Sequence, residues 1–372
     1  MESASNSGVS LPRRPSVGQS IGCELTAGVR RPSSTTLLCL SEELSVSSQR
    51  PSRRNSWANE RPDSLGCESG YAPGYLFPLH LLGEVDQQAR RMDTAHLGPL
   101  VPFASGSNSE LFKGELFNRP IVVKMVSEAE SVDELALLEF DTELELLQRC
   151  SHPNILGLLG AGDVPRRFLV LEYLSGGTLS ERLLQHSSVT ERTLNRVRPN
   201  LYETLKIGIQ LADALDYLHY RFHPQACIIH RDVKPENIGF SSSGSIVLFD
   251  FGLSACVRRF HHSHSKYEMS GGTGSLRYMA PEVALGMAYN HKVDVYSYAI
   301  LMWQTATGKI PFNGASKHDY MKYVVHGGIR PPLFQLWPEL FNSTLSRAWD
   351  SNADIRPEFS EILSSFKNLI PA

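Results

Sequence analysis

The sequence predicts an α+β fold with two lobes, because β-like and helical patterns occupy different parts of the chain. Short β-like runs dominate from about residue 97 to about residue 174. A single long helical stretch, at 131–150, interrupts them. Helical spacing of apolar residues then prevails from about residue 201 onward.

A serine-rich first segment is expected to lie outside that fold. Residues 1–70 contain 16 serines with many Arg, Pro and Gly residues and few large apolar ones, so they bury too little surface to repay the entropy of ordering. Residues 1–41 hold only two acids, which is also typical of a transit peptide, although no amphipathic pattern supports that alternative. We predict a disordered tail over 1–96, with a short flanking helix within 75–92, and a folded domain over 97–371.

Composition also predicts the compartment of the protein. The six cysteines are scattered without a CxxC pair, which disfavours a zinc site and a disulfide framework. No apolar run approaches the roughly 18 to 20 residues that span a bilayer, and no apolar signal region follows Met1. The formal charge of -3 gives no global field that would attract nucleic acid or an anionic membrane. We therefore expect a cytoplasmic or nuclear protein with no transmembrane segment and no nucleic-acid partner.

The first part of the domain is expected to form five strands and one helix. Ser131 can cap the helix at 131–150, with Glu134 as its capping-box partner. The β-like runs lie at 97–103, 110–116, 120–126, 155–162 and 168–174. A later helix is predicted within 201–220, where apolar residues fall on one face: Ile207, Leu211, Ala214, Leu215 and Leu218.

Ionisable residues are crowded into the stretch CIIHRDVKPENIGF at 227–240. Pro235 follows Lys234 there, which disfavours a helix and predicts a loop framed by the short apolar runs on either side. Thirteen residues after Asn237 comes Asp250, which follows the apolar residues IVLF in the run IVLFDFG. Carboxylates from two loops are therefore expected in one neighbourhood.

The motifs HRDVKPEN, DFG and MAPE resemble the catalytic loop, the metal-binding turn and the end of the activation segment of eukaryotic protein kinases. The resemblance covers the chain from about residue 97 onward. It implies the two-lobed protein kinase fold, with an N-lobe of antiparallel strands and one helix at about 97–173 and a mainly helical C-lobe at about 178–371. It also implies ATP-dependent phosphorylation of serine and threonine hydroxyls on protein substrates, with Mg²⁺ as the metal.

The resemblance assigns roles to the crowded residues. Asp232 would accept or orient the proton of the substrate hydroxyl, and Lys234 would approach the transferred phosphate. Asn237 and Asp250 would supply the oxygen ligands of Mg²⁺. Arg231 resembles the arginine that pairs with a phosphorylated activation segment, whereas Glu236 is expected to be a solvated or structural residue.

Lys124, in the run IVVK, corresponds to the lysine that contacts the α and β phosphates. It requires a carboxylate to hold it in place. Glu143 is the predicted partner, because Phe140 precedes it by three residues and His152 follows it by nine, as in the family. Glu139, one turn earlier, is the rival, and an exposed helix acid is the alternative for Glu143.

The nucleotide loop departs from the family pattern. Where the family has G-x-G-x-x-G, this chain keeps only Gly106, with Ala104 and Ser109 at the outer positions, and read alone the loop favours a plain hairpin. Each lost glycine restricts close approach to phosphate, so we expect weaker ATP capture. Val122 stands where the family often has alanine, which narrows the pocket. Further nucleotide contacts are expected from Leu111, just after the nucleotide loop. The segment between the lobes should add contacts from Leu171, Glu172 and Leu174.

Other motif residues are expected to be structural or regulatory. Glu282 and Arg356 resemble a buried ion pair, and Asp294 resembles the acid that holds the backbone of the catalytic loop. In the activation segment, Ser275 resembles the hydroxyl that bonds the catalytic aspartate and lysine. The better phosphorylation candidates are Ser270 and Thr273. A metal site formed by His261, His262 and His264 is the disfavoured alternative to a solvated loop.

Lys234, with the runs GTGSLRYMAPE, LEYLSGGTL and HPNILGLLG, points to the tyrosine-kinase-like group of serine/threonine kinases. The expected partners are protein substrates and an upstream activating kinase, and the oligomeric state is left open. Arg-Arg-x-Ser recurs three times in the tail, either as acceptors for basic-directed kinases or as charges that solvate it. A pseudokinase scaffold remains the alternative because of the altered glycine loop, and tyrosine or dual specificity is disfavoured by Lys234.

Overall fold

The computed structural model describes residues 90–105, 108–127, 134–187, 201–259 and 265–370, with the backbone only of 185–187. Several of the predictions above lie outside these residues. They concern the tail up to residue 89, the cap at Ser131, the loop glycine Gly106 and the histidines His261, His262 and His264.

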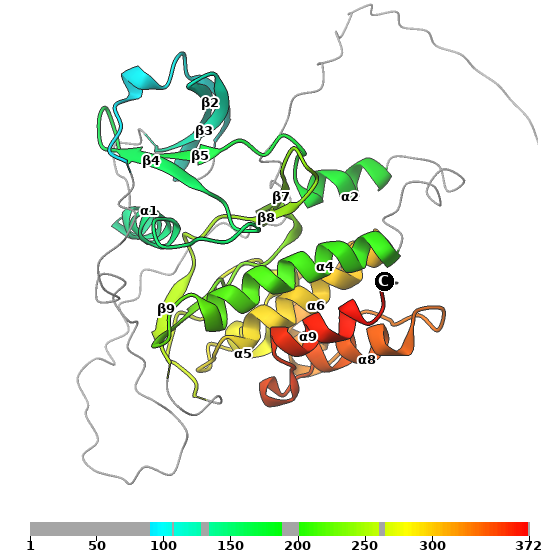
Figure 1. The fold of residues 1–372 in the computed structure, drawn as a ribbon. Coiled ribbons are helices and arrows are strands. Elements are labelled where there is room, and N and C mark those ends of the chain that lie inside the picture. Colours follow the sequence, from blue (N-terminus) through cyan, green and yellow to red (C-terminus); the bar gives the residue numbers. More distant parts are fainter. Residues whose placement is uncertain (1–89, 106–107, 128–133, 188–200, 260–264, 371–372) are drawn as a thin grey trace, which may run out of the picture. The chain divides into compact units, whose positions relative to one another are not determined.

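Five antiparallel strands form the sheet of the N-lobe (Figure 1). Their order across the sheet is β1-β2-β3-β5-β4. The strands are β1 (Val101–Ser105), β2 (Ser109–Leu116), β3 (Arg119–Val126), β4 (Leu158–Gly162) and β5 (Phe168–Glu172). Each predicted β-like run thus overlaps one strand.

The pleat of β3 separates the core of the sheet from its functional face. Ile121, Val123 and Met125 belong to a buried apolar cluster on one face of the sheet. Val122 and Lys124 alternate with them and line a cavity instead. Successive side chains of a strand point to opposite faces. The run IVVK therefore delivers its lysine to the side opposite this cluster.

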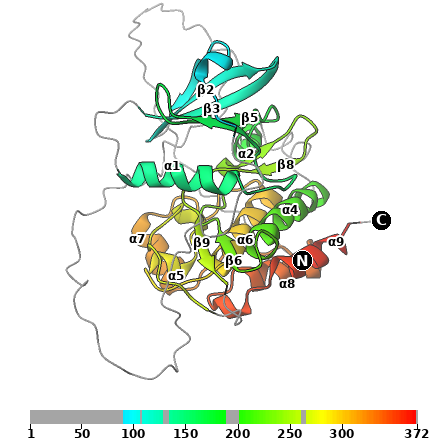
Figure 2. The same cartoon turned by 60° about the vertical axis from the view of Figure 1, so that its left-hand side comes forward.

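The helix of the N-lobe, α1 (Glu134–Leu147), lies beneath the sheet (Figure 1 and Figure 2). Four of its five buried residues, Ala136, Phe140, Glu143 and Leu147, recur at intervals of three and four, which places them on one face. One position of this mostly apolar face is an acid. Glu143 is thus buried because of its helical register.

Helices make up most of the C-lobe. The α-helices are α2 (Leu179–Ser187), α4 (Leu201–Asp216), α5 (Pro281–Ala284), α6 (Lys292–Thr307), α7 (Lys317–Asp319), α8 (Glu339–Ala348) and α9 (Phe359–Lys367). Short 3₁₀ turns occur at η2 (Thr94–His96), η4 (Pro235–Asn237), η5 (Leu276–Tyr278) and η7 (Ala353–Ile355), and π-helical turns at η3 (Tyr217–Arg221) and η6 (Tyr320–His326). None of the helices found within the described ranges is both long and apolar enough to cross a bilayer.

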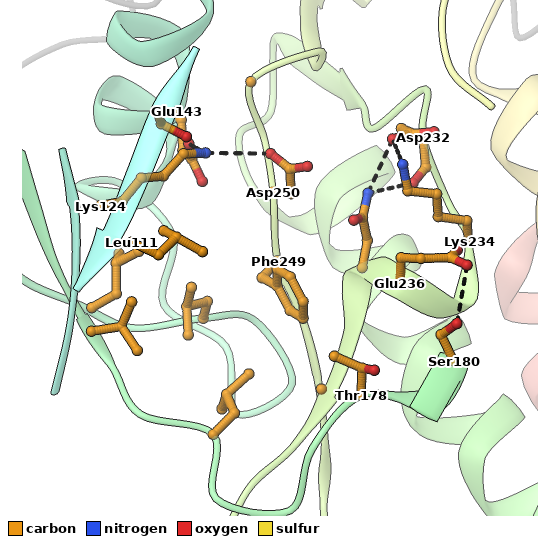
Figure 3. Close-up of a pocket in the computed structure, with 18 of the residues that line it drawn as sticks. Leu111, Lys124, Glu143, Thr178, Ser180, Asp232, Lys234, Glu236, Phe249 and Asp250 are labelled. Carbon is orange, nitrogen blue, oxygen red and sulfur yellow. Dashed lines mark hydrogen bonds and ion pairs between the residues drawn. The ribbon is translucent and has the colours of Figure 1, made fainter. Parts of the chain in front are cut away.

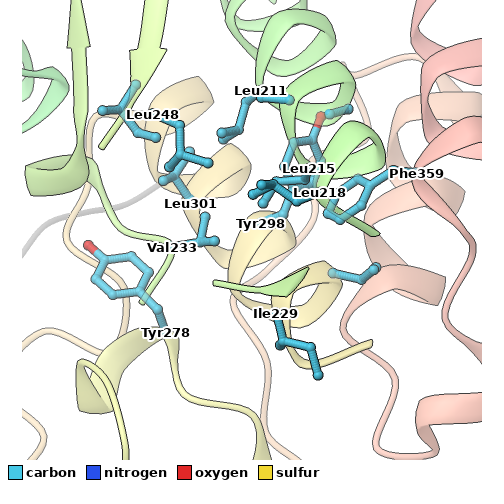
Figure 4. Packing of buried hydrophobic residues seen from close by; sticks show 14 of the residues in the cluster. Leu211, Leu215, Leu218, Ile229, Val233, Leu248, Tyr278, Tyr298, Leu301 and Phe359 are labelled. Atoms are coloured by element: carbon cyan, nitrogen blue, oxygen red, sulfur yellow. The ribbon is translucent and has the colours of Figure 1, made fainter. Parts of the chain in front are cut away.

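The core of the C-lobe forms where α4, α6 and α9 meet (Figure 4). Leu211 and Leu215 come from α4, Tyr298 and Leu301 from α6, and Phe359 from α9, and all are buried. Almost every residue of α6 is buried, as expected of a helix that is surrounded by other elements. The predicted apolar face within 201–220 is confirmed by the burial of Ile207, Leu211, Ala214, Leu215 and Leu218.

Two small antiparallel ribbons frame the polar loops. Strand β6 (Ala226–Ile229) pairs with β9 (Ala255–Arg258), and β7 (Ile238–Phe240) pairs with β8 (Ile246–Leu248). The loop predicted at 230–237 lies between β6 and β7, so its polar residues stand on a rigid frame. Together with the sheet and the helices, these ribbons confirm the predicted α+β fold with two lobes.

The flanking helix predicted within 75–92 is not present over 90–92. Arg91 forms a parallel bridge with Ala161 of β4, and the Met92 N–H donates to the Ala161 carbonyl oxygen at 2.9 Å. The unpaired edge of β4 supplies backbone hydrogen bonds there, which outweigh the local helical preference. Residues 75–89 lie outside the described part of the chain.

Candidate active site

A cavity of about 490 Å³ lies between the sheet and the loops of the C-lobe (Figure 3). Its volume falls within the range of small-molecule and cofactor sites. Most of the predicted nucleotide residues line it: Ser109, Leu111, Val122, Lys124, Leu171, Glu172 and Leu174. The predicted catalytic and metal residues Glu143, Asp232, Lys234, Asn237 and Asp250 line it as well.

Ala104 is not among the residues that line the cavity, whereas its neighbour Phe103 is. The pairing of β1 with β2 is irregular between Pro102 and Ala104, and Ala104 stands opposite Leu111. Because Leu111, the strand partner of Ala104, does line the cavity, a nucleotide contact from Ala104 stays a prediction.

Lys124 is held by two carboxylates. Its Nζ lies 2.5 Å from Glu143 Oε2 and 3.5 Å from Asp250 Oδ1. Burial alone lowers the pKa of Lys124, but these two charges outweigh burial and hold the pKa above its usual value. The ammonium charge therefore persists at neutral pH. Glu143, the predicted partner, forms this ion pair with Lys124, and the backbone of the rival Glu139 lies beside Gly252.

Asp294 fixes the backbone of the catalytic loop. Its two carboxylate oxygens accept the backbone N–H groups of His230 at 2.8 Å and Arg231 at 2.9 Å. Arg231 has a φ of 67°, a strained conformation for a residue with a side chain. Burial alone raises the pKa of Asp294, but its bond with His219 and nearby charges hold it below the usual value. An ionised Asp294 thus stabilises the strained turn just before Asp232.

Asp232 is the centre of a polar cluster (Figure 3). Its Oδ2 lies 2.7 Å from Lys234 Nζ and 3.2 Å from Asn237 Nδ2. Lys234 Nζ also donates to Ser275 Oγ at 3.1 Å. The Ser275 hydroxyl thus contacts the lysine as expected, but it is the Ser275 backbone N–H that donates to Asp232, at 3.0 Å.

Asp250 completes the site from the second loop. It has a φ of 68°, so the chain turns sharply after β8 and the carboxylate reaches Lys124. Burial alone raises the pKa of Asp250, but Lys124 and Lys234 outweigh it and hold the pKa below its usual value. Asn237 and Asp250 thus bring an amide and an ionised carboxylate to one cavity, and oxygens of these types are what Mg²⁺ prefers.

The activation segment contacts the catalytic loop through Arg231. The Arg231 guanidinium donates to Ser270 Oγ and to the Tyr289 hydroxyl, both at 3.2 Å. Thr273 Oγ1 lies 2.8 Å from Ser270 Oγ. Of the two predicted phosphorylation candidates, Ser270 is therefore bonded directly to the arginine, and Thr273 is connected to it through Ser270.

The end of the activation segment is anchored by an ion pair. Arg356 donates to both carboxylate oxygens of Glu282, at 2.6 and 2.9 Å. The guanidinium also donates to the backbone carbonyls of Lys292 and Asp350. The side chain of Arg356 is fully buried. The ion pair expected from the motifs MAPE and DIRPEF is thereby confirmed.

Some residues of the cavity carry no catalytic motif of their own. Phe249 precedes the aspartate of DFG and lies at the centre of the site (Figure 3). Gly239 and Thr178 also line the cavity. The sequence signal that could have found these residues is Gly239 itself, because a glycine inside a short apolar strand often marks a place where another group approaches the backbone closely. Glu236, expected to be solvated or structural, accepts a hydrogen bond from Ser180 Oγ at 3.1 Å.

Comparisons with known proteins agree with this geometry. A family model described as protein tyrosine and serine/threonine kinase matches residues 101–366. Serine/threonine-protein kinase VIK of Arabidopsis thaliana is 34% identical over 270 residues, which cover 71% of this chain and 58% of the relative. Serine/threonine-protein kinase TNNI3K of Homo sapiens is 31% identical over 269 residues, covering 72% and 30%.

A third relative carries a broader name. Serine/threonine/tyrosine-protein kinase HT1 of Arabidopsis thaliana is 30% identical over 291 residues, covering 76% of this chain and 69% of the relative. A probable serine/threonine-protein kinase of Dictyostelium discoideum is matched over only 26% of its length. The chain thus spans between about a quarter and three fifths of several relatives it matches. Because the family model covers most of the chain and the cavity holds the residues of its motifs, this chain belongs to the protein tyrosine and serine/threonine kinase family.

Proposed function

We propose that this chain transfers the γ-phosphoryl group of ATP to serine and threonine hydroxyls of protein substrates. The observation that carries the proposal is the convergence of Lys124, Asp232, Asn237 and Asp250 on one cavity. Phosphoryl transfer requires positioned charges and an oriented hydroxyl more than covalent chemistry by the protein. The family and the names of the relatives support the same reaction.

The proposed role of each residue follows from its position in the cavity. Lys124, kept protonated by Glu143, binds phosphate oxygens from the sheet side. Asp232 orients the substrate hydroxyl and accepts its proton, and its pairing with Lys234 places a positive charge beside the transferred group. The bridge from Lys234 to Ser275 ties the activation segment to this pair. That arrangement supports serine and threonine as acceptors.

The donor set suits Mg²⁺. Asn237 and Asp250 would hold the metal through an amide oxygen and a carboxylate oxygen. Bound Mg²⁺ would neutralise charge on the phosphates of ATP. The lowered pKa of Asp250 keeps its carboxylate ionised and available as a ligand.

Phosphorylation of the activation segment is proposed as the control. A phosphate on Ser270 or Thr273 would carry about -1.5 to -2 charges at pH 7 next to Arg231. Because Arg231 precedes Asp232 directly, such a pairing would fix the segment against the catalytic loop. An upstream kinase is the expected source of this phosphate. Treating the active protein with a phosphatase should lower its activity, and Ser270→Ala with Thr273→Ala should remove the response, whereas Ser243→Ala on an exposed turn should not.

The proposal is tested by phosphate transfer from labelled ATP with Mg²⁺ to a generic protein substrate. The chain should be purified from eukaryotic cells, so that upstream phosphorylation is present. Asp232→Asn should lower the rate by about 100-fold or more, whereas Asp163→Asn, an exposed aspartate remote from the cavity, should not. The label should be found on phosphoserine and phosphothreonine.

The same assay separates the proposal from a pseudokinase scaffold. The altered glycine loop, with Ala104 and Ser109, is the observation that favours a scaffold. Transfer by the wild-type chain that is no faster than transfer by Asp232→Asn would favour the scaffold. Label found chiefly on phosphotyrosine would contradict the substrate class.

A further inference from the structure

Gly239 is the middle residue of the strand β7 and lines the nucleotide cavity. Its two strand neighbours, Ile238 and Phe240, are buried apolar residues. A glycine inside a strand weakens it unless something must approach the backbone closely. A Cβ at residue 239 would lie 2.3 Å from Leu174 Cδ1 and 3.3 Å from Phe249 Cε1. Leu174 thus occupies the space that a side chain at 239 would fill.

The path of the chain after β5 holds Leu174 in that place. The Gly176 N–H donates to the Phe240 carbonyl at 2.9 Å, and the Phe240 N–H donates to the Gly177 carbonyl at 2.9 Å. Thr178 forms an antiparallel bridge with Gly239 itself. The segment 174–178 therefore runs alongside β7 as an added strand.

Arg182 of α2 reinforces this pairing. Its guanidinium donates to the Gly176 carbonyl at 3.1 Å. The same group stacks on the ring of Phe240, with Cζ 3.3 Å from the ring centroid. One side chain thus clamps the segment 174–178 and the strand β7 together. The position of Leu174 is therefore fixed by the backbone pairing of the residues that follow it with β7, and by the contacts of Arg182 with both segments.

We propose that Gly239 is a specificity-determining position of the nucleotide cavity. Because residue 239 has no side chain, Leu174 can pack directly on the backbone of β7. Leu174 and Phe249 then form the wall of the cavity beneath the base. The base would then lie between this wall and Val122 of β3. Leu174, Phe249 and Val122 all line the cavity. The inference rests on the proposed function, since it takes the ligand to be a nucleotide. It adds that the apolar group of this wall comes from the segment between the lobes and not from β7.

The arrangement makes residues 174 and 239 complementary. A side chain at 239 excludes Leu174, and removing Leu174 leaves β7 without an apolar group at this wall. A swap of the two should therefore restore the surface, which neither single change can do. Since the proposed wall lies against the base and not against the phosphates, the changes should lower nucleotide affinity and leave the transfer step intact.

The test is calorimetric titration of the full chain with ADP and Mg²⁺, because ADP binding does not depend on transfer to a substrate. Gly239→Ala and Leu174→Ala should each weaken binding by about tenfold, the loss expected when an apolar contact with the base is removed. The double variant Leu174→Ala with Gly239→Leu should recover affinity to within about threefold of the wild type. Leu336→Ala, which removes a leucine that is 98% exposed, is the matched control and should bind as the wild type does.

Kinetics give a second readout. The single variants should raise KM for ATP by a similar factor and leave kcat unchanged. Leu174→Ala keeps the test decisive if Gly239→Ala does not fold. Wild-type affinity in Leu174→Ala, or no recovery in the double variant, would overturn the inference while leaving the proposed function in place. A wild-type chain that does not bind ADP would overturn both.

Discussion

The Lys124 ammonium and the Glu143 carboxylate lie 2.5 Å apart, and Glu143 is only 2% exposed. The pair connects β3 to α1, so it joins the sheet and the helix of the N-lobe at the edge of the cavity. Asp250 of the C-lobe reaches the same ammonium at 3.5 Å. One lysine therefore contacts elements of both lobes.

Glu143→Gln should lower nucleotide-dependent activity strongly. The neutral amide cannot balance the buried lysine charge, so Lys124 should turn toward Asp250 and compete with its metal-binding role. We expect kcat/KM to fall by about 10- to 100-fold, which corresponds to about 1.4 to 2.7 kcal/mol of transition-state stabilisation. Glu145→Gln, on the same helix but at a partly exposed position paired with Arg149, is the control. Equal activities in the two variants would contradict the role of Glu143.

Arg356→Met should destabilise the fold far more than Arg347→Met does. Arg356 is buried and bonded to both oxygens of Glu282, so its loss leaves an unpaired charge and orphaned carbonyls. The expected cost is about 3 to 5 kcal/mol. Arg347 pairs with Glu361 at an exposed position, so its loss should cost less than about 1 kcal/mol. Urea unfolding measures both, and similar midpoints would show that the buried pair is not a major anchor.

Stability should decrease as the pH falls from 7 toward 5.5. Burial lowers the pKa of His230 and of His291 below the usual value. The folded protein therefore keeps these histidines neutral, while the unfolded chain takes up protons below a pH of about 6.5. The stabilisation is present above that pH and is lost as the pH falls toward the folded-state pKa. Each histidine adds a slope of up to about 1.4 kcal/mol per pH unit.

His291→Gln isolates one of these contributions. His291 contacts Glu358 at 3.0 Å and the Tyr220 hydroxyl at 3.1 Å, and glutamine keeps a polar group there without a titrating proton. Unfolding free energies of this variant should depend less steeply on pH between 7 and 5.5. His318→Gln, at an exposed position, should leave the slope unchanged. A steeper slope in His291→Gln would reverse the assigned sign.

The sequence predicted the elements of the fold and most of the site because both depend on local patterns. Alternation along IVVK places Lys124 on the sheet face opposite the buried cluster that contains Ile121 and Val123. The loop that contains Asp232 is predicted by the position of Pro235. The choice of Glu143 over Glu139 was harder, since both acids stand on one helix. Both acids line the cavity, but in the structure Glu143 shares the buried face of Ala136 and Phe140 and pairs with Lys124.

Other features depended on contacts between distant segments. Phe103 lines the cavity beside an irregularity in the pairing of β1 with β2, which the sequence does not show. The close packing of Leu174 on Gly239 requires the segment 174–178 to pair with β7, some 60 residues later in the chain. Hydrogen bonding to the edge of β4 likewise takes the place of a helix over residues 90–92, the described end of the range predicted to be helical. No local pattern in the sequence encodes these pairings.

We propose that residues of both lobes form one site for Mg²⁺ and ATP. The most direct measurement is a crystal structure of the chain with Mg²⁺ and a non-hydrolysable ATP analogue. We expect the phosphates beside Lys124, with the metal bound by oxygens of Asn237 and Asp250, and the γ-phosphate facing Asp232. A nucleotide bound elsewhere, or a metal that leaves both Asn237 and Asp250 without a bond to it, would contradict the account.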